Sequence, residues 1–87
     1  MEISYDSAKR AHTLAERGLD FDDARRVFEG AIVNYVDDRK YYGEVRWISV
    51  GYLDARLLMI VWTQRGDARH VISMRKANDR EQKKFRR

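Results

Sequence analysis

Within residues 6–30, two successive segments place their hydrophobic and polar residues with the period of an α-helix, so the pattern predicts two helices. Asp6 is placed to cap a first helix, and Gly18 stands where a left-handed residue ends one. Asp20 is placed to cap a second helix, which Gly30 ends. The apolar face of the first helix comprises Ala8, Ala11, Leu14 and Ala15, and the predicted buried stripe of the second comprises Phe21, Ala24, Val27 and Phe28.

From residue 31 onward the period changes to two, which is typical of β-strands. Four segments rich in Val, Ile, Trp and Tyr are separated by polar turns, and they predict an antiparallel meander. Ile3 and Tyr5 alternate with polar residues as a short extra strand before the first helix would. The four segments are Ala31–Val36, Val45–Leu53, Leu57–Thr63 and Arg69–Arg75, and the third is central because it is apolar on both faces.

The last of these strands predicts a basic face on the sheet. Strict alternation places Arg69 and Arg75 on one side together with Ser73, opposite Met74. The same alternation directs His70 toward the core, where a hydrogen-bonded structural histidine is the more common outcome. A histidine titrating near neutrality is also a candidate acid or base.

Residues 78–87 are predicted to form a C-terminal helix. Phe85 is almost its only apolar residue, so the helix is either exposed or docked on something. Asn78 and Glu81 have the spacing of a capping box, which explains the glutamate without any catalytic role.

Together these elements predict a single α+β domain over residues 1–87, with two N-terminal helices packed on a four-stranded antiparallel meander and a C-terminal helix. A chain of 87 residues with 44% hydrophobic residues can supply one core. It contains no cysteine, which excludes disulfides and thiolate metal sites. The N-terminus lacks the pattern of a signal peptide, and the longest apolar run, Leu57–Trp62, is too short to span a bilayer, so we expect a cytoplasmic protein.

Acidic and basic residues are sorted between the two halves of the chain. Residues 1–44 carry 7 Lys and Arg against 10 Asp and Glu, whereas residues 45–87 carry 11 against 4. A basic surface at one end of a small fold is typical of proteins that bind nucleic acid, because each cation that neutralises a phosphate releases a counterion. A solvated basic helix and tail is the alternative.

Six short motifs then occur in the order found in one known family, and the chain resembles the BrnT ribonuclease toxins of bacterial type II toxin–antitoxin systems. The resemblance covers nearly the whole chain. It implies a RelE-like fold, a ribonuclease activity that arrests translation, and neutralisation by a BrnA-like antitoxin, usually a ribbon-helix-helix DNA-binding protein. The motifs are Tyr5-Asp6-x-x-Lys9, Gly18-x-x-Phe21-x-x-Ala24, Val27-Phe28, Arg46-x-Ile48-x-x-Gly51, Thr63-x-Arg65-Gly66, and Val71-Ile72-Ser73-x-Arg75-x-Ala77 followed by Glu81.

The chain departs from the family pattern at five places. Tyr5 stands where the family usually has Trp and Ser7 where it has Pro, and both changes are conservative for a strand end and a helix start. Glu16-Arg17 replaces a Lys-His pair, His70 stands where the family often has Arg, and Phe85 stands where Tyr is common. If the missing histidine or tyrosine does chemistry in relatives, this chain either uses Arg17 and His70 instead or is a weaker enzyme.

Cleavage of RNA without a metal requires a proton acceptor near the 2′-hydroxyl, cations around the phosphorane and a proton donor for the leaving oxygen. The resemblance to RelE-like enzymes implies that cations carry much of this work, and we expect neither a metal nor a cofactor, since His12 and His70 are far apart and Asp37-Asp38 has the character of a turn. The predicted catalytic residues are Lys9, Arg46, Arg65 and Arg75, and the predicted nucleic-acid contacts are Arg69, Lys76, Lys83 and Lys84.

Structural roles compete with some of these assignments. Arg65 could form an ion pair with Asp67, and Arg46 could be buried beside a carboxylate. Tyr41 and Tyr42 fall in a loop, where they could stack on bases or contact a partner.

The predicted partners are RNA and a BrnA-like antitoxin, in a 2:2 heterotetramer that reaches operator DNA only through the antitoxin. The alternative function is a non-catalytic basic module that binds nucleic acid or docks a partner.

Overall fold

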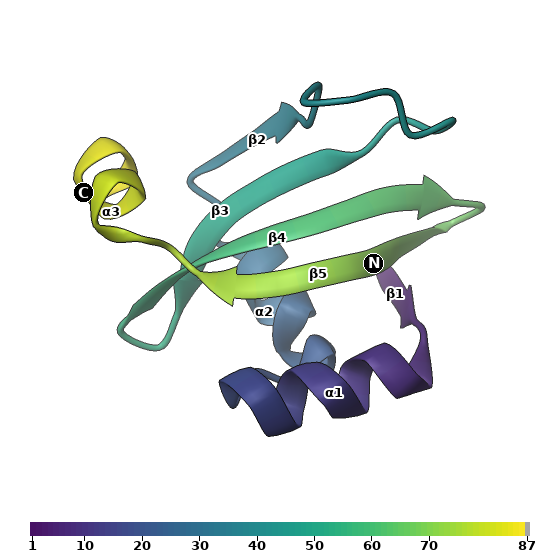
Figure 1. Ribbon diagram of the computed structural model, residues 1–87, viewed down its shortest axis with the longest axis horizontal. Helices are drawn as coiled ribbons and strands as arrows, with labels where there is room; N and C mark the ends of the chain where they lie inside the picture. Colours follow the sequence, from purple (N-terminus) through teal and green to yellow (C-terminus); the bar gives the residue numbers. More distant parts are fainter. Residues whose placement is uncertain (87) are drawn as a thin grey trace.

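The computed structural model describes residues 1–86, which form five β-strands, three α-helices and a 3₁₀ turn (Figure 1). The predicted end of the last helix at Arg87 lies outside these described residues. In chain order the elements are β1 Glu2–Tyr5, α1 Ser7–Arg17, the 3₁₀ turn Phe21–Asp23, α2 Ala24–Glu29, β2 Val33–Val36, β3 Trp47–Leu53, β4 Arg56–Arg65, β5 Ala68–Lys76 and α3 Asp79–Phe85.

The strands form one mixed sheet in the order β1-β5-β4-β3-β2. The predicted meander is present as β2 to β5, but it is not the whole sheet. The short N-terminal strand β1 adds to it parallel to β5, with Ile3 opposite Arg69 and Tyr5 opposite Val71. An entirely antiparallel four-stranded sheet is therefore wrong at this edge. β5 has an open outer edge that β1 can pair with, and Ile3 and Tyr5 gain contact with the core there.

Helix α2 and the 3₁₀ turn cover one face of the sheet, where α2 contacts β3 and the turn contacts β5. In Figure 1 α2 is seen behind β4 and β5. The predicted buried stripe of the second helix is confirmed, since all four of its residues lie in this core. Gly51 lets β3 approach α2 closely, because an added Cβ would lie 3.0 Å from the carbonyl oxygen of Val27. Buried Ser49 lies on the same face and accepts a 2.7 Å hydrogen bond from the indole N–H of Trp62.

Helix α1 lies along the β1 edge of the sheet, and its caps are as predicted. Asp6 accepts from the backbone N–H of Ala8, and Gly18 is left-handed with φ 68°. Its apolar face, however, is turned outward, and Leu14 is 45% exposed. Thr13 is the buried residue of this helix. The amphipathic pattern was thus wrong as a guide to which side of α1 packs.

A β-bulge in β5 reverses the predicted alternation. Val61 pairs with Ser73 whereas Trp62 pairs with Val71, so Ile72 has no partner of its own. Arg69 consequently lies on the helix-covered side, with its guanidinium 4.3 Å from the Trp62 ring centre. The prediction that Arg69 shares a face with Arg75 is wrong.

His70 is displaced by the same bulge to the face opposite Met74, so its predicted position on the core side is also wrong. It is half-buried there, with Nδ1 2.9 Å from Ser4 Oγ on β1. Burial, followed by the charges of Arg65 and Lys9, lowers the pKa of His70.

The second face of the sheet is covered only in part, by α3. Its predicted capping box between Asn78 and Glu81 is confirmed. Phe85 stacks on Tyr35 of β2, with ring centres 6.2 Å apart and planes inclined by 16°. The helix is therefore docked, and the rest of this face stays open.

Candidate functional site

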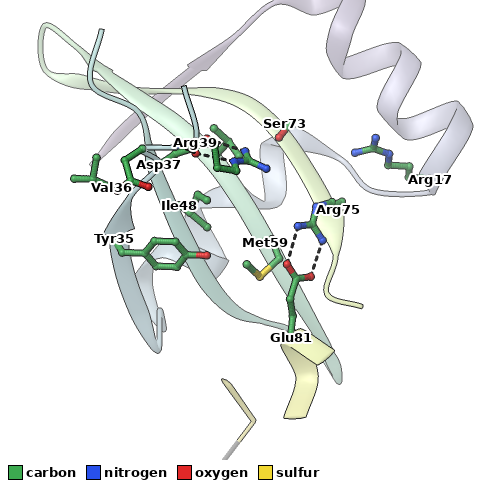
Figure 2. Close-up of a pocket in the computed structure, with 12 residues that line it drawn as sticks. Arg17, Tyr35, Val36, Asp37, Arg39, Ile48, Met59, Ser73, Arg75 and Glu81 are labelled. Carbon is green, nitrogen blue, oxygen red and sulfur yellow. Dashed lines mark hydrogen bonds and ion pairs between the residues drawn. The ribbon is translucent and has the colours of Figure 1, made fainter. Parts of the chain in front are cut away.

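The open face of the sheet contains a hollow of about 510 Å³ between β2, β5 and α3 (Figure 2). Its apolar floor is made by Ile48, Met59 and Val61 of β3 and β4. Alternation along these two strands aims the three side chains away from α2. We call this hollow the groove, and its polar lining comprises Arg17, Tyr35, Asp37, Asp38, Arg39, Ser73, Arg75 and Glu81.

Arg75 and Glu81 form the best-defined polar contact of the groove. Arg75 Nη1 and Nη2 donate to the two carboxylate oxygens of Glu81 at 2.7 and 2.8 Å. This pairing, together with the backbone N–H of Asn78, lowers the pKa of Glu81 to about 2. Glu81 therefore has two functions at once, because the carboxylate that closes the capping box also fixes the plane of a guanidinium on β5.

Two more guanidinium groups line the groove. Arg17, in the last turn of α1, donates a 2.9 Å hydrogen bond to the carbonyl oxygen of Met74. Arg39, after β2, donates to both carboxylate oxygens of buried Asp37 at 2.7 Å. Figure 2 shows Arg17 and Arg39 on two sides of the groove with Arg75 between them in the view.

Two hydroxyl groups complete the polar lining. Tyr35 points into the groove from β2, where burial raises its pKa and the charge of Glu81 raises it further. Ser73 lies two residues before Arg75 on β5. The groove thus joins three guanidinium groups and two hydroxyl groups over an apolar floor, and two of its three carboxylates, Asp37 and Glu81, are paired with arginines. Guanidinium and hydroxyl donors are suited to binding a phosphate diester.

Three of the predicted catalytic residues lie at the other end of the same face. Arg46 donates to Glu44 at 3.1 Å, and Arg65 lies 3.8 Å from the second oxygen of the same carboxylate. The carboxylate partner that was the structural alternative for Arg46 is therefore present, and Arg65 pairs with the same Glu44 carboxylate, not with Asp67 as its structural alternative supposed. Lys9 is exposed in the first turn of α1, and its charge contributes to the lowered pKa of His70.

Strand register separates these residues from Arg75. On β4, Met59 pairs with Arg75. His70, whose pKa is lowered by the charges of Arg65 and Lys9, pairs instead with Thr63, which is four residues further along β4. At about 3.3 Å per residue this is roughly 13 Å. The four predicted catalytic residues do not form one compact site.

The remaining predicted contacts are dispersed. Lys76 is exposed at the end of β5, and Lys83 and Lys84 are exposed in the last turn of α3. Arg69 lies on the opposite side of the sheet from the groove.

Sequence reasoning missed Arg39 and Tyr35, and it raised Arg17 only as a replacement for a family residue. The spacing Asp37-x-Arg39 was the available signal for Arg39, but it also fits an ordinary turn. No local pattern distinguishes Tyr35 from any other aromatic residue on a strand.

The residues that line the groove fall within a match to a known protein family. One family model, described as the ribonuclease toxin BrnT of type II toxin–antitoxin systems, matches residues 5–81. The chain belongs to the BrnT family. No curated protein matches the chain. The BrnT match runs from Tyr5 at the end of β1 to Glu81, so it includes both members of the Arg75–Glu81 pair and ends before Lys83 and Lys84.

Membership of the BrnT family makes the chain a ribonuclease toxin of a type II system, and such systems pair a toxin with an antitoxin. None of the helices within residues 1–86 is long and apolar enough to cross a membrane. Over the same residues, His, Asp and Glu side chains form no group of three or more that could hold a metal ion.

Proposed function

We propose that the protein is a metal-independent, RelE-like endoribonuclease that cuts RNA in the groove and thereby arrests translation. The observation that carries this proposal is the bidentate Arg75–Glu81 pair, which holds one guanidinium in a fixed orientation beside Arg17 and Arg39. Oriented cations over an apolar floor stabilise a phosphorane dianion without reorganising during the reaction.

In the reaction, the RNA 2′-oxygen attacks the adjacent phosphorus, the 2′-proton passes to an acceptor, and the 5′-oxygen leaves with a proton. Arg75 is the residue proposed to contact the phosphorane oxygens, and Glu81 is its positioning residue. A carboxylate with a pKa of about 2 is a weak base, which favours this role for Glu81 over proton abstraction.

Lys9, Arg46 and Arg65 are proposed to hold RNA phosphates away from the reacting one, with Lys76, Lys83 and Lys84 adding charge around the groove. Arg69, on the other face, stays a prediction as a nucleic-acid contact.

We propose a BrnA-like ribbon-helix-helix antitoxin as the partner, in a 2:2 complex that covers the groove and binds operator DNA through the antitoxin alone. Two copies of the toxin on an antitoxin dimer would give the two-fold symmetry that is common among oligomers. Because the proposed substrate is translated RNA, we expect the toxin to act in the cytoplasm.

The test is cleavage by the purified chain, freed of antitoxin, in the presence of EDTA. RNA should be cut, and DNA should remain intact because it lacks the 2′-hydroxyl. Arg75→Ala should lower kcat by about two orders of magnitude with little change in RNA affinity, as loss of one oriented donor does elsewhere. Arg25→Ala is the matched control, since Arg25 is exposed on α2 on the far side of the sheet.

Loss of cleavage in EDTA would overturn the metal-independent mechanism. Wild-type protein that binds RNA but never cuts it would favour the non-catalytic binding module. Changing Lys83 and Lys84 to Ala should weaken binding and flatten its salt dependence while kcat is retained.

A further inference from the structure

A second hollow, of about 380 Å³, adjoins the groove at the end of β2. It is formed by the segment between β2 and β3, residues 37–46, which we call the β2–β3 loop. The two hollows share Val36 and Asp37 in their linings. A single extended ligand can therefore occupy both, passing around the end of β2.

The β2–β3 loop is held in shape by one buried carboxylate. Asp37 is 4% exposed and accepts hydrogen bonds from the Arg39 guanidinium and, at 3.1 Å, from the hydroxyl of Tyr42. The Arg39 hydrogen bonds lower the pKa of Asp37 to about 2. Tyr42 is further held by Arg46, whose guanidinium carbon lies 4.2 Å from the ring centre. The hollow is thus formed before any ligand arrives.

Apolar side chains in the hollow are left uncovered. Tyr41 is 94% exposed, and Val45 is 59% exposed beside it in the chain. An aromatic ring this exposed has nothing in the described chain to pack against. Its surroundings are cationic, since the ammonium group of Lys40 lies 5.1 Å from the Tyr42 ring centre.

The charges around the hollow favour an anionic ligand. Its two carboxylates are both neutralised within the fold, Asp37 by Arg39 and Glu44 by Arg46. Arg46 contacts the Tyr42 ring as well as Glu44, and Arg65 lies 3.8 Å from the same Glu44 carboxylate. Lys40 contacts the Tyr42 ring, and within the described residues it pairs with neither carboxylate of the hollow, so the cations beside this aromatic surface exceed the carboxylates. A positively charged channel with exposed aromatic rings is the arrangement that binds single-stranded nucleic acid, because bases stack on the rings while cations follow the phosphates.

We propose that the β2–β3 loop is a nucleobase-binding subsite, in which Tyr41 stacks on a base of single-stranded RNA and Lys40 and Arg46 contact its flanking phosphates. The subsite rests on the proposed function, since it takes a nucleotide close to the one whose phosphate lies in the groove. It assigns Arg46 to substrate binding and separates it from the chemistry at Arg75.

The subsite is tested with a fluorescently labelled, single-stranded 2′-O-methyl oligonucleotide, which can bind but cannot be cleaved. Tyr41→Ala should bind it about tenfold more weakly by anisotropy, because one base–aromatic stack is lost. The salt dependence should be unchanged, whereas Lys40→Ala should flatten it. Tyr41→Phe keeps the ring and should bind like the wild type, and Leu14→Ala, which removes another exposed apolar residue on α1, is the control for surface changes.

An oligonucleotide made of abasic 2′-O-methyl units gives the sharpest comparison, since it carries the phosphates without the bases. The wild type and Tyr41→Ala should bind this abasic oligonucleotide with equal affinity. Equal binding of the base-containing oligonucleotide by the two proteins would overturn the subsite, as would a wild type that binds neither oligonucleotide. If Tyr41→Ala leaves RNA binding unchanged but weakens capture of the antitoxin, the loop is a protein-docking surface and the proposal is wrong.

Cleavage of unmodified RNA separates this proposal from the one on which it rests. A wild type that binds the 2′-O-methyl oligonucleotide through Tyr41 but does not cut RNA retains the subsite and overturns the ribonuclease mechanism. A wild type that cuts RNA, with Tyr41→Ala showing the same KM and the same cleavage positions, retains the mechanism and overturns the subsite.

Discussion

Replacing Glu81 by glutamine separates its two structural functions. Glutamine can close the capping box with Asn78 as glutamate does, so the start of α3 is kept. The charge that pairs with Arg75 is lost. The substitution therefore measures the ion pair with little disturbance of the helix.

The expected magnitude follows from the pKa of Glu81, which falls from 4.5 to about 2 in the fold. At 1.36 kcal/mol for each tenfold change in proton affinity, this corresponds to about 3 kcal/mol of stabilisation. Because the Arg75 side chain is 41% exposed, solvent screens part of this interaction. We expect Glu81→Gln to lower the free energy of unfolding by about 1–2 kcal/mol at pH 7.

The pH dependence has a defined sign. The pKa of Glu81 is depressed in the folded state, so its stabilisation is present above about pH 4.5 and is lost as the pH falls toward 2. Urea unfolding curves of wild type and Glu81→Gln, followed by tryptophan fluorescence, should differ at pH 7 and 5, and the difference should shrink progressively as the pH falls from about 4 toward 2. Glu29→Gln, which changes an exposed glutamate at the end of α2, is the control. Its stability difference from the wild type should not show this dependence on pH.

A ¹³C NMR titration of the Glu81 carboxylate checks the same pair directly. Its midpoint should lie near 2 in the wild type and move back toward 4.5 in Arg75→Ala, because Arg75 is the largest cause of the shift. In the Arg75→Ala background, Glu81→Gln should leave the free energy of unfolding almost unchanged, because the ion pair is already absent. A stability difference that is the same from pH 7 to 3, or an ordinary midpoint in the wild type, would refute the ion-pair account.

Two core substitutions test the packing beneath the groove. Gly51→Ala places a Cβ 3.0 Å from the Val27 oxygen and 3.1 Å from its Cγ1, so urea unfolding should show a loss of about 1–3 kcal/mol, whereas Gly30→Ala meets open space and should change little. Ser49→Ala leaves the buried indole N–H of Trp62 without its acceptor and should lower the free energy of unfolding by about 1–3 kcal/mol in the same assay. An unchanged urea midpoint would show that this hydrogen bond does not stabilise the fold.

Features set by neighbouring residues could be predicted from the sequence. The caps at Asp6, Gly18 and Asn78 depend on side chains within a few positions of each other, and the structure confirms all three. The parallel pairing of β1 with β5 joins residues 66 positions apart, such as Ser4 and His70, and no local pattern encodes it.

The candidate site was predicted less completely, for two physical reasons. One unpaired residue, Ile72, reverses the alternation of β5 and moves Arg69 to the other face, and a bulge leaves no clear mark on hydrophobic spacing. In addition, the groove is assembled from six separate segments, so Arg39 and Tyr35 gain a role only through their proximity to Arg75 in space.

The position of β5 between β1 and β4 has a consequence for the order in which this toxin can fold during synthesis. The first strand made, β1, must wait for residues 68–71 before it has a partner, and the sheet cannot be completed by any earlier portion of the chain. Arg75 and Glu81 leave the ribosome last of all the groove residues. The groove can therefore assemble only after residues up to Glu81 have been synthesised and have left the ribosome. A truncated product that ends before β5 lacks both this strand and Arg75, on which the proposed chemistry depends.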